Sequence, residues 1–245
     1  MNRRSRATLP ACCAALALCA AMTAGAFRTS TVDATDYDAF WLWSGVAPQA
    51  VMARARTVYV LHGQIGAPPG RDRPVGVMAQ GSVPRLRHGD VWVVYRAHTL
   101  RWPPAVYATV LQQLARWRRA GNPVVGVQID FDAGASYLEE YVGFLRGFRR
   151  RLPEEYRLGI TGLLDWSANA DPDVISGLAG VVDEVVVQTY QGRRTITDYE
   201  AYLPRVGRLT IPFKVGLIQR GEWREPSYLS ASPWFRGYVV FLQNP

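Results

Sequence analysis

Two acidic residues, Asp130 and Asp132, end the run Val124–Asp132 and are the first candidates for chemistry. Alternate side chains of a strand point to opposite faces, so both carboxylates share a face with Gln128 and Gly126, and the other face is apolar. Burying two acids without partners is expensive. The run therefore predicts a strand whose far end opens into a wet functional pocket. The alternative is an exposed edge strand in which Asp forms the turn.

The spacing of the two acids has an electrostatic consequence. At the rise of a strand, the Cα atoms of Asp130 and Asp132 lie roughly 6.6 Å apart. Like charges this close raise the pKa of one carboxyl, which would keep it protonated as a general acid at neutral pH.

Eight segments with strand character position these acids, and helical patterns alternate with them. Alternation of strands and helices indicates parallel pairing, so the fold class is α/β and the architecture a (β/α)8 TIM-type barrel, with a degenerate or missing helix after strand two. The runner-up, an open doubly wound sheet, lacks a glycine-rich turn after its first strand. The predicted strands are Ala39–Val46, Thr57–Ile65, Asp90–Ala97, Val124–Asp132, Arg157–Trp166, Glu184–Tyr190, Phe213–Gln219 and Gly237–Gln243.

The connecting segments carry helix signals. Pro103 and Pro104 begin one predicted helix, and Ser136 with Glu139 form a capping-box pattern before another. Further helices are expected at Pro172–Val182 and Tyr199–Leu209. The stretch between residues 66 and 89 has no helical period and is expected to be a loop, with a possible short strand at Val75–Ala79.

The carboxyl ends of the strands carry the chemistry in such barrels. Here they are rich in carboxylates, amides and aromatic rings, which hydrogen-bond hydroxyl groups and stack on sugar rings. Tyr and Trp also simply fill barrel cores, so no single aromatic residue is specific. Besides Asp130 and Asp132, the candidates are Asp165 as a catalytic residue and Gln128, Tyr190, Gln188, Trp43, His62, Gln64, Tyr95, Trp166 and Gln219 as substrate-binding residues.

The first 26 residues resemble an export signal. Arg3, Arg4 and Arg6 precede a short apolar stretch, and Ala24-Gly25-Ala26 resembles a cleavage site. We expect residues 1–26 to be removed, residues 27–37 to form a leader, and residues 38–245 to form one domain that is periplasmic or secreted, without a transmembrane segment. All three cysteines lie in the signal, and Cys19 follows a partial lipobox, so a lipid anchor is the alternative.

The formal net charge is +8, and the signal contributes three arginines and no acid, so the remainder carries +5. This modest excess, without a basic run interleaved with aromatics, argues against a nucleic-acid partner. An anionic polysaccharide remains open as a partner, and the oligomeric state is not determined by the sequence.

The strand-four run resembles the signature Asp-Gly-x-Asp-x-Asp-x-Glu of family 18 chitinases. Gly126 and Asp130 match it, whereas Gln128 replaces the first inward Asp and Asp132 replaces the catalytic Glu. Gln188-Thr189-Tyr190-Gln191 similarly resembles that family's Met-x-Tyr-Asp motif, with Gln191 in place of the Asp. The resemblance implies that Asp132 protonates the leaving oxygen, Asp130 orients a substrate acetamido group, and Tyr190 and Gln188 hold the sugar.

Over nearly all of the segment after residue 37, the chain resembles a bacterial family known as domain of unknown function 3142, which implies kinship with glycosidase barrels. The similar stretches are 38–43, 128–132, 162–166 and 188–192.

Three functions follow as hypotheses. The first is a glycoside hydrolase acting on a polysaccharide or oligosaccharide, with a variant scheme that pairs Asp132 with Asp165 across the neighbouring strand. The second is a catalytically degenerate carbohydrate-binding barrel, suggested by the replaced motif acids. The third, metal-dependent deacetylation by His62, His98 and an Asp, lacks a His-x-x-x-His pair, so neither a metal nor another cofactor is expected.

Overall fold

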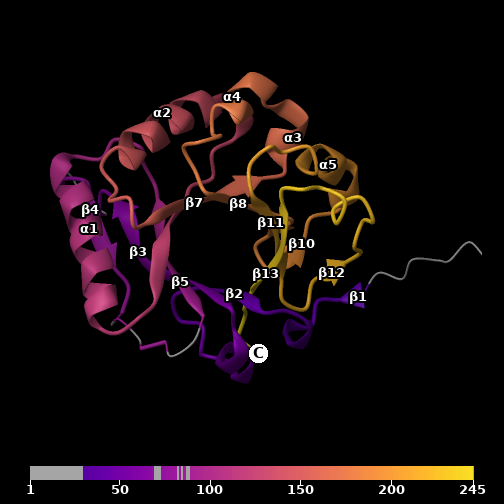
Figure 1. Cartoon of the computed structure of the whole chain (residues 1–245), viewed down its shortest axis with the longest axis horizontal. Helices are drawn as coiled ribbons and strands as arrows, with labels where there is room; N and C mark the ends of the chain where they lie inside the picture. Colours follow the sequence, from indigo (N-terminus) through magenta and orange to yellow (C-terminus); the bar gives the residue numbers. More distant parts are fainter. Residues whose placement is uncertain (1–29, 69–72, 82, 84, 87–88, 245) are drawn as a thin grey trace, which may run out of the picture.

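The computed structural model describes residues 30–68, 73–81, 83, 85–86 and 89–244 (Figure 1). The predicted signal segment and its cysteines lie outside the described residues. No helix in the described part of the chain is long and apolar enough to span a bilayer.

Eight parallel strands form a closed ring, which confirms the (β/α)8 prediction. Each strand pairs with the next in chain order, and β2 pairs with both β13 and β3 to close the ring. The strands are β2 (Ala39–Leu42), β3 (Thr57–Gly66), β5 (Asp90–Ala97), β6 (Val124–Asp130), β7 (Arg157–Leu163), β8 (Glu184–Gln188), β11 (Phe213–Ile218) and β13 (Phe235–Phe241).

Helices cover only one arc of the ring, where α1, α2, α4 and α5 follow one another in Figure 1. The α-helices are α1 (Pro104–Arg119), α2 (Leu138–Arg149), α3 (Asp165–Asn169), α4 (Pro172–Ser176) and α5 (Tyr199–Val206). The 3-10 turns are η1 (Ala34–Asp36), η2 (Ala50–Arg54) and η3 (Ala135–Tyr137). As predicted, none of the described residues between β3 and β5 is helical. Instead β4 (Gly76–Ala79) pairs antiparallel with the end of β3.

Short strand pairs complete the structure. β1 (Ser30–Thr31) pairs with β12 (Glu222–Trp223), and β9 (Tyr190–Gln191) forms a hairpin with β10 (Arg194–Thr195). Val32 and Ala34 are buried, so the described part of the expected leader packs on the barrel instead of standing outside it.

Several local predictions differ from the structure. The capping box does not form, because η3 takes up Ser136 and the α2 N-cap is Tyr137, which makes no side-chain cap bond. The fifth barrel strand ends at Leu163, three residues before the expected Trp166, because Asp165 begins α3. β2 ends at Leu42 instead of Val46, and α4 ends at Ser176 instead of Val182.

At the amino-terminal ends of the strands, the barrel interior is closed by a polar contact between strands that are not neighbours. The Tyr59 hydroxyl donates to Glu184, and Lys214 Nζ lies 3.1 Å from Glu184 Oε2 and 3.0 Å from the Tyr59 hydroxyl. Because β3 and β8 are not adjacent, these groups meet through the interior. A buried acid, base and phenol satisfy one another there, as burial requires.

Further along the strands, large aromatic rings fill the interior, because glycines on neighbouring strands leave room for them. A Cβ at Gly126 would lie 2.7 Å from Trp92 Cζ3 and 2.5 Å from the Arg157 carbonyl oxygen. Trp92 in turn stacks on Tyr59 with ring centroids 5.8 Å apart. The small start of the β6 inner face is therefore a packing requirement.

We predict that Gly126→Ala lowers the free energy of unfolding by about 1–3 kcal/mol, because the added methyl overpacks the interior. Gly143→Ala is the matched control: this exposed α2 position has open space around it, and the change should stabilise the helix by about 0.5–1 kcal/mol. Urea unfolding of both variants checks this. A Gly126→Ala variant as stable as the wild type would contradict the packing account.

Candidate functional site

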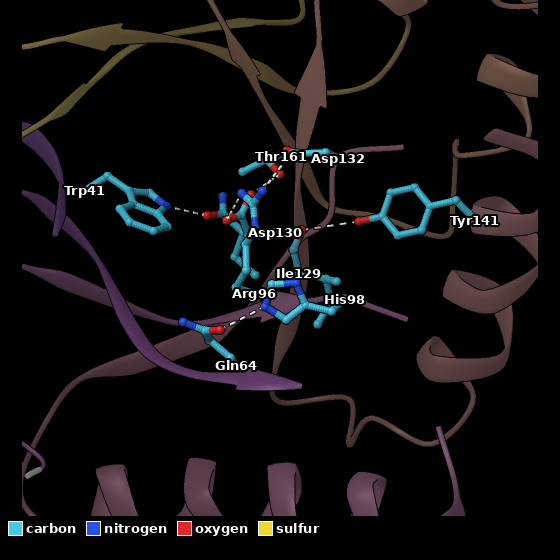
Figure 2. A network of polar contacts seen from close by, with 10 residues as sticks. Trp41, Gln64, Arg96, His98, Ile129, Asp130, Asp132, Tyr141 and Thr161 are labelled. Atoms are coloured by element: carbon cyan, nitrogen blue, oxygen red, sulfur yellow. Dashed lines mark hydrogen bonds and ion pairs between the residues drawn. The ribbon is translucent and has the colours of Figure 1, made fainter. Parts of the chain in front are cut away.

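Asp130 lies at the carboxyl end of β6, fully buried inside the ring. Its Oδ2 accepts a hydrogen bond from Arg96 Nη1 at 2.9 Å, and its Oδ1 accepts one from Thr161 Oγ1 at 2.8 Å. Figure 2 shows the three side chains converging. The buried carboxylate therefore has a partner on each neighbouring strand, β5 and β7.

Asp132 follows β6, and about half of its side chain (49%) is exposed. The second terminal nitrogen of Arg96, Nη2, pairs with Asp132 Oδ2, so one guanidinium joins both acids. This arrangement is possible because Arg96 is the β5 residue in register with Asp130. The planar fork of arginine suits two acceptors held side by side.

The main cause of the pKa shift at the site differs from the one that the sequence predicted, which was repulsion between the two acids. The pKa of Asp130 is raised, chiefly by burial, while Arg96 and the Thr161 hydrogen bond oppose the rise and Asp132 adds the smallest contribution. Burial also raises the pKa of the Tyr190 phenol, and Asp130 adds to that rise. Desolvation, more than repulsion between the two acids, therefore favours a protonated carboxyl at Asp130.

Two further polar side chains, Gln128 and Tyr190, face this interior. Gln128 Oε1 accepts a hydrogen bond from Trp41 Nε1 at 2.8 Å, across the barrel from β2 to β6. Gln128 Nε2 and the Tyr190 hydroxyl are buried and have no hydrogen-bond partner within the described residues. Two donors next to Asp130 are thus available to a ligand oxygen.

Aromatic side chains form one side of the site. Trp43 is partly buried, with its ring centroid 4.4 Å from that of Trp41 and 6.0 Å from that of Phe241. Tyr190 packs on Phe241 at 4.7 Å. Gln188 is buried on the same face of β8 as the interior residue Val186. These positions agree with the face expected for Trp43, Tyr190 and Gln188.

Gln64 also faces the site, although its neighbour His62 does not. A bulge at Leu61–Gly63 shifts the β3–β5 register, so Gln64 pairs with Arg96. Gln64 Oε1 lies 2.8 Å from Nε2 of the exposed His98 (Figure 2). The bulge places an extra residue in the strand and thereby separates two side chains that strict alternation would put together.

Three residues that were predicted to bind substrate point away from the barrel interior, so the structure does not place them at the site. His62 lies between β3 and α1, 3.3 Å from Gln113 Oε1, and its burial lowers its pKa. Tyr95 packs edge-on against it, because Tyr95 is on the face of β5 opposite Arg96. Trp166 donates from Nε1 to the Ala133 carbonyl at 2.6 Å and packs in the outer core.

Asp165 and Gln219 hold loops in place. Asp165 Oδ2 accepts from the Ala135 amide at 2.8 Å, and its Oδ1 accepts from Asn169, so it joins α3 to η3. Gln219 exchanges hydrogen bonds with Gln49 and accepts from the Gln243 amide at 2.9 Å. The contacts of both residues are therefore with loop groups and not with Asp130 or Asp132.

Sequence reasoning missed Arg96 and Thr161. Both lie on the inner face by plain alternation: Arg96 follows Trp92 and Val94 at steps of two. Within the described residues, no group of three His, Cys, Asp or Glu side chains is placed to hold a metal. His62 contacts Gln113 of α1 outside the ring, whereas His98 contacts Gln64, which faces the site.

Two cavities of about 580 Å³ accompany the barrel, and neither is lined by Asp130 or Asp132. One lies beside Trp43, with Leu61 and Met52 in its wall. The other lies outside the ring between β7, β8, α4 and α5. Asp130 is fully buried and paired with Arg96, whereas Asp132 is half exposed at the surface.

The comparisons with known proteins agree with this geometry. Residues 100–196 match the family described as "Domain of unknown function (DUF3142)". The match contains Asp130, Asp132 and Tyr190, but Arg96, Trp43 and the stretch 38–43 lie outside it. The resemblance to this family is therefore confirmed over residues 100–196. No curated protein matches the chain.

Solved structures share the fold. The spore cortex-lytic enzyme SleL of Bacillus cereus superposes with a TM-score of 0.50 at 15% identity, over 69% of this chain and 45% of SleL, so the match spans less than half of that protein. The xylanase-A-amylase inhibitor protein XAIP-III gives 0.53 at 11% identity, over 84% and 93%. XAIP-II of Scadoxus multiflorus gives 0.50 at 13%, over 83% and 92%. These matches show that the chain shares the barrel fold of these proteins.

We predict that Asp130→Asn changes how stability depends on pH. A raised pKa in the folded state means that stability is fully present below the unfolded pKa and is lost as pH rises through the folded pKa. The wild type should therefore lose stability relative to Asp130→Asn as pH rises above about 4, in urea unfolding between pH 3.5 and 8. Asp36→Asn, at an exposed position, controls for net charge. A difference that grows in favour of the wild type would mean that Arg96 outweighs burial.

Proposed function

We propose that this barrel acts on a polysaccharide or oligosaccharide containing amino sugars, as a glycoside hydrolase of the cell envelope. The observation that carries the proposal is the pair Asp130 and Asp132, joined by Arg96 at the carboxyl end of β6. The partly buried Trp43, directly after β2 in the same ring of strand ends, supplies a ring on which a sugar can stack.

The two acids divide the work by their exposure. Asp132 is the acid that solvent reaches, so it meets the glycosidic oxygen and donates its proton to the leaving group. The acetamido carbonyl oxygen of the sugar then attacks the anomeric carbon as that bond breaks. Water opens the resulting ring intermediate and gives a proton back to Asp132, which restores the acid.

Asp130 binds and orients the acetamido group. A carboxyl oxygen of Asp130 accepts from the acetamido N–H, and the unpartnered Tyr190 hydroxyl and Gln128 Nε2 donate to ligand oxygens. Arg96 must release Asp132 before proton transfer, because Arg96 Nη2 contacts Asp132 Oδ2, an oxygen that has to reach the leaving group. Substrate entry displaces that contact in this scheme.

A second function, saccharide binding without cleavage, is favoured by the same ion pair. If Arg96 stays bound to Asp132 when the ligand is present, no general acid reaches the glycosidic oxygen. Thermal protection by a glycan that is never cleaved would support this alternative.

The activity test is Asp132→Asn, assayed by release of reducing ends from amino-sugar polymers. Loss of the proton donor should reduce turnover at least 100-fold, the size of a general-acid contribution. Asp165→Asn should keep most of the turnover, since its oxygens bind Ala135 and Asn169, and Asp36→Asn is the surface control. Unchanged turnover in Asp132→Asn would sink the assignment, and loss in Asp165→Asn would favour the scheme that pairs it with Asp132.

Export is part of the proposal. We expect the mature chain to begin at Phe27 and to be recovered from the periplasm or the medium. N-terminal sequencing of the protein purified from each cell fraction tests this. A chain beginning at Cys19 and found in the membrane fraction would establish the lipid anchor instead.

A further inference from the structure

Two arginines meet at the other side of the barrel mouth. Arg193 lies in the turn between β9 and β10, and Arg220 follows β11. Arg193 Nη2 donates to the Asn244 carbonyl oxygen at 3.3 Å, and Arg220 Nη2 donates to the same oxygen at 2.5 Å. The two nitrogens therefore lie no further apart than the sum of these distances, 5.8 Å.

Within the described residues, no anionic side chain compensates the charge of this pair. Both guanidinium groups are exposed, and among the described residues neither forms an ion pair. Two like charges at this separation repel each other, and a single neutral carbonyl is their shared acceptor. Arg220 also holds a left-handed backbone conformation with φ 65°, which a non-glycine residue adopts only when its surroundings impose it. An anion between the two groups would remove the repulsion.

A buried amide beside the pair gives independent support. Gln243 is nine-tenths buried, and its Oε1 accepts from Arg193 Nε at 3.0 Å. Its Nε2 is buried and has no partner within the described residues. Rotating the amide cannot repair this, because the N–H groups would then face the N–H of Arg193. An additional acceptor oxygen is what this cluster lacks.

The cluster adjoins the aromatic side of the candidate site. Gln243 comes two residues after Phe241, whose ring contacts those of Tyr190 and Trp43 at 4.7 and 6.0 Å. The charge of +5 outside the predicted signal adds a long-range attraction for anions. A ligand that crosses the mouth from Trp43 thus reaches Arg193 and Arg220.

From this geometry we infer that Arg193, Arg220 and Gln243 form a subsite for the carboxylate of an acidic saccharide. The inference rests on the proposed saccharide function and names the substrate class: a glycan in which a carboxylate-bearing unit neighbours the unit held at Asp130. A planar carboxylate can bridge two guanidinium groups, with charge-assisted bonds to each.

The subsite is tested first by NMR on the purified chain, with the arginine Nε–Hε signals as reporters. D-galacturonate should shift the signals of Arg193 and Arg220, and neutral D-galactose should not. Inorganic phosphate separates carboxylate from phosphate recognition: tighter binding of phosphate than of galacturonate would overturn the carboxylate assignment. No shift with either anion would overturn the subsite.

Affinity for longer ligands tests the role of the subsite in the mouth. Calorimetry should show trigalacturonate binding at least tenfold more tightly than the neutral galactotriose. The double variant Arg193→Gln/Arg220→Gln should abolish this tenfold preference. The control Arg194→Gln, at the exposed first residue of β10 in the same hairpin, should keep it. A preference that survives the double variant overturns the inference.

The Trp43 indole N–H signal keeps the two proposals distinguishable. If the arginine signals respond to galacturonate and Trp43 does not respond to a trisaccharide of N-acetylated amino sugars, the anion subsite stands and the saccharide function fails. If Trp43 responds to that amino-sugar trisaccharide and the arginines do not respond to galacturonate, the saccharide function stands and the subsite fails.

Discussion

The ion pairs between Arg96 and the two acids are the interaction on which the mouth of the barrel depends. Asp130 is fully buried, and an unpaired charge there would be very costly. Arg96 and Thr161 supply its partners from both neighbouring strands, whereas Asp132 remains half exposed to water. Removing one partner of such a group typically destabilises more than the pair itself contributes. The same contact therefore limits both stability and chemistry.

The register between β5 and β6 places these groups together, and packing fixes that register. Arg96 lies opposite Asp130, and four residues earlier Trp92 lies opposite Gly126, where a larger residue would overlap its ring. A slip by one residue would turn every side chain to the other face and bring Tyr95 into the interior in place of Arg96. The glycine that looked like part of a motif is thus the residue that lets the interior close and sets the site above it.

Much of the fold and part of the site could be predicted from the spacing of apolar and polar residues alone. The eight strands, their parallel order, the missing helix after the second and the inward placement of Asp130 follow from alternation and spacing. The inward placement of Arg96 follows from the same alternation. The bulge at His62 could not be foreseen, because it depends on the pairing between β3 and β5, which single-strand periodicity does not contain. The predicted helix cap at Ser136 is wrong for a similar reason. The Ala135 amide donates a hydrogen bond to Asp165, and this tertiary contact holds the segment before α2 in place of a side-chain cap.

The depth of the barrel determines how a ligand can approach. The Tyr59–Glu184–Lys214 contact closes the base, and the bond from Trp41 to Gln128 crosses the interior just below Asp130. A ligand can therefore enter only from the carboxyl ends of the strands, where it meets Asp132 before Asp130. The exposed acid is the one in contact with Arg96 Nη2, so the first contact a ligand makes is also the one that can release Arg96. Access to the buried acid is in this way coupled to the ion pair that covers it.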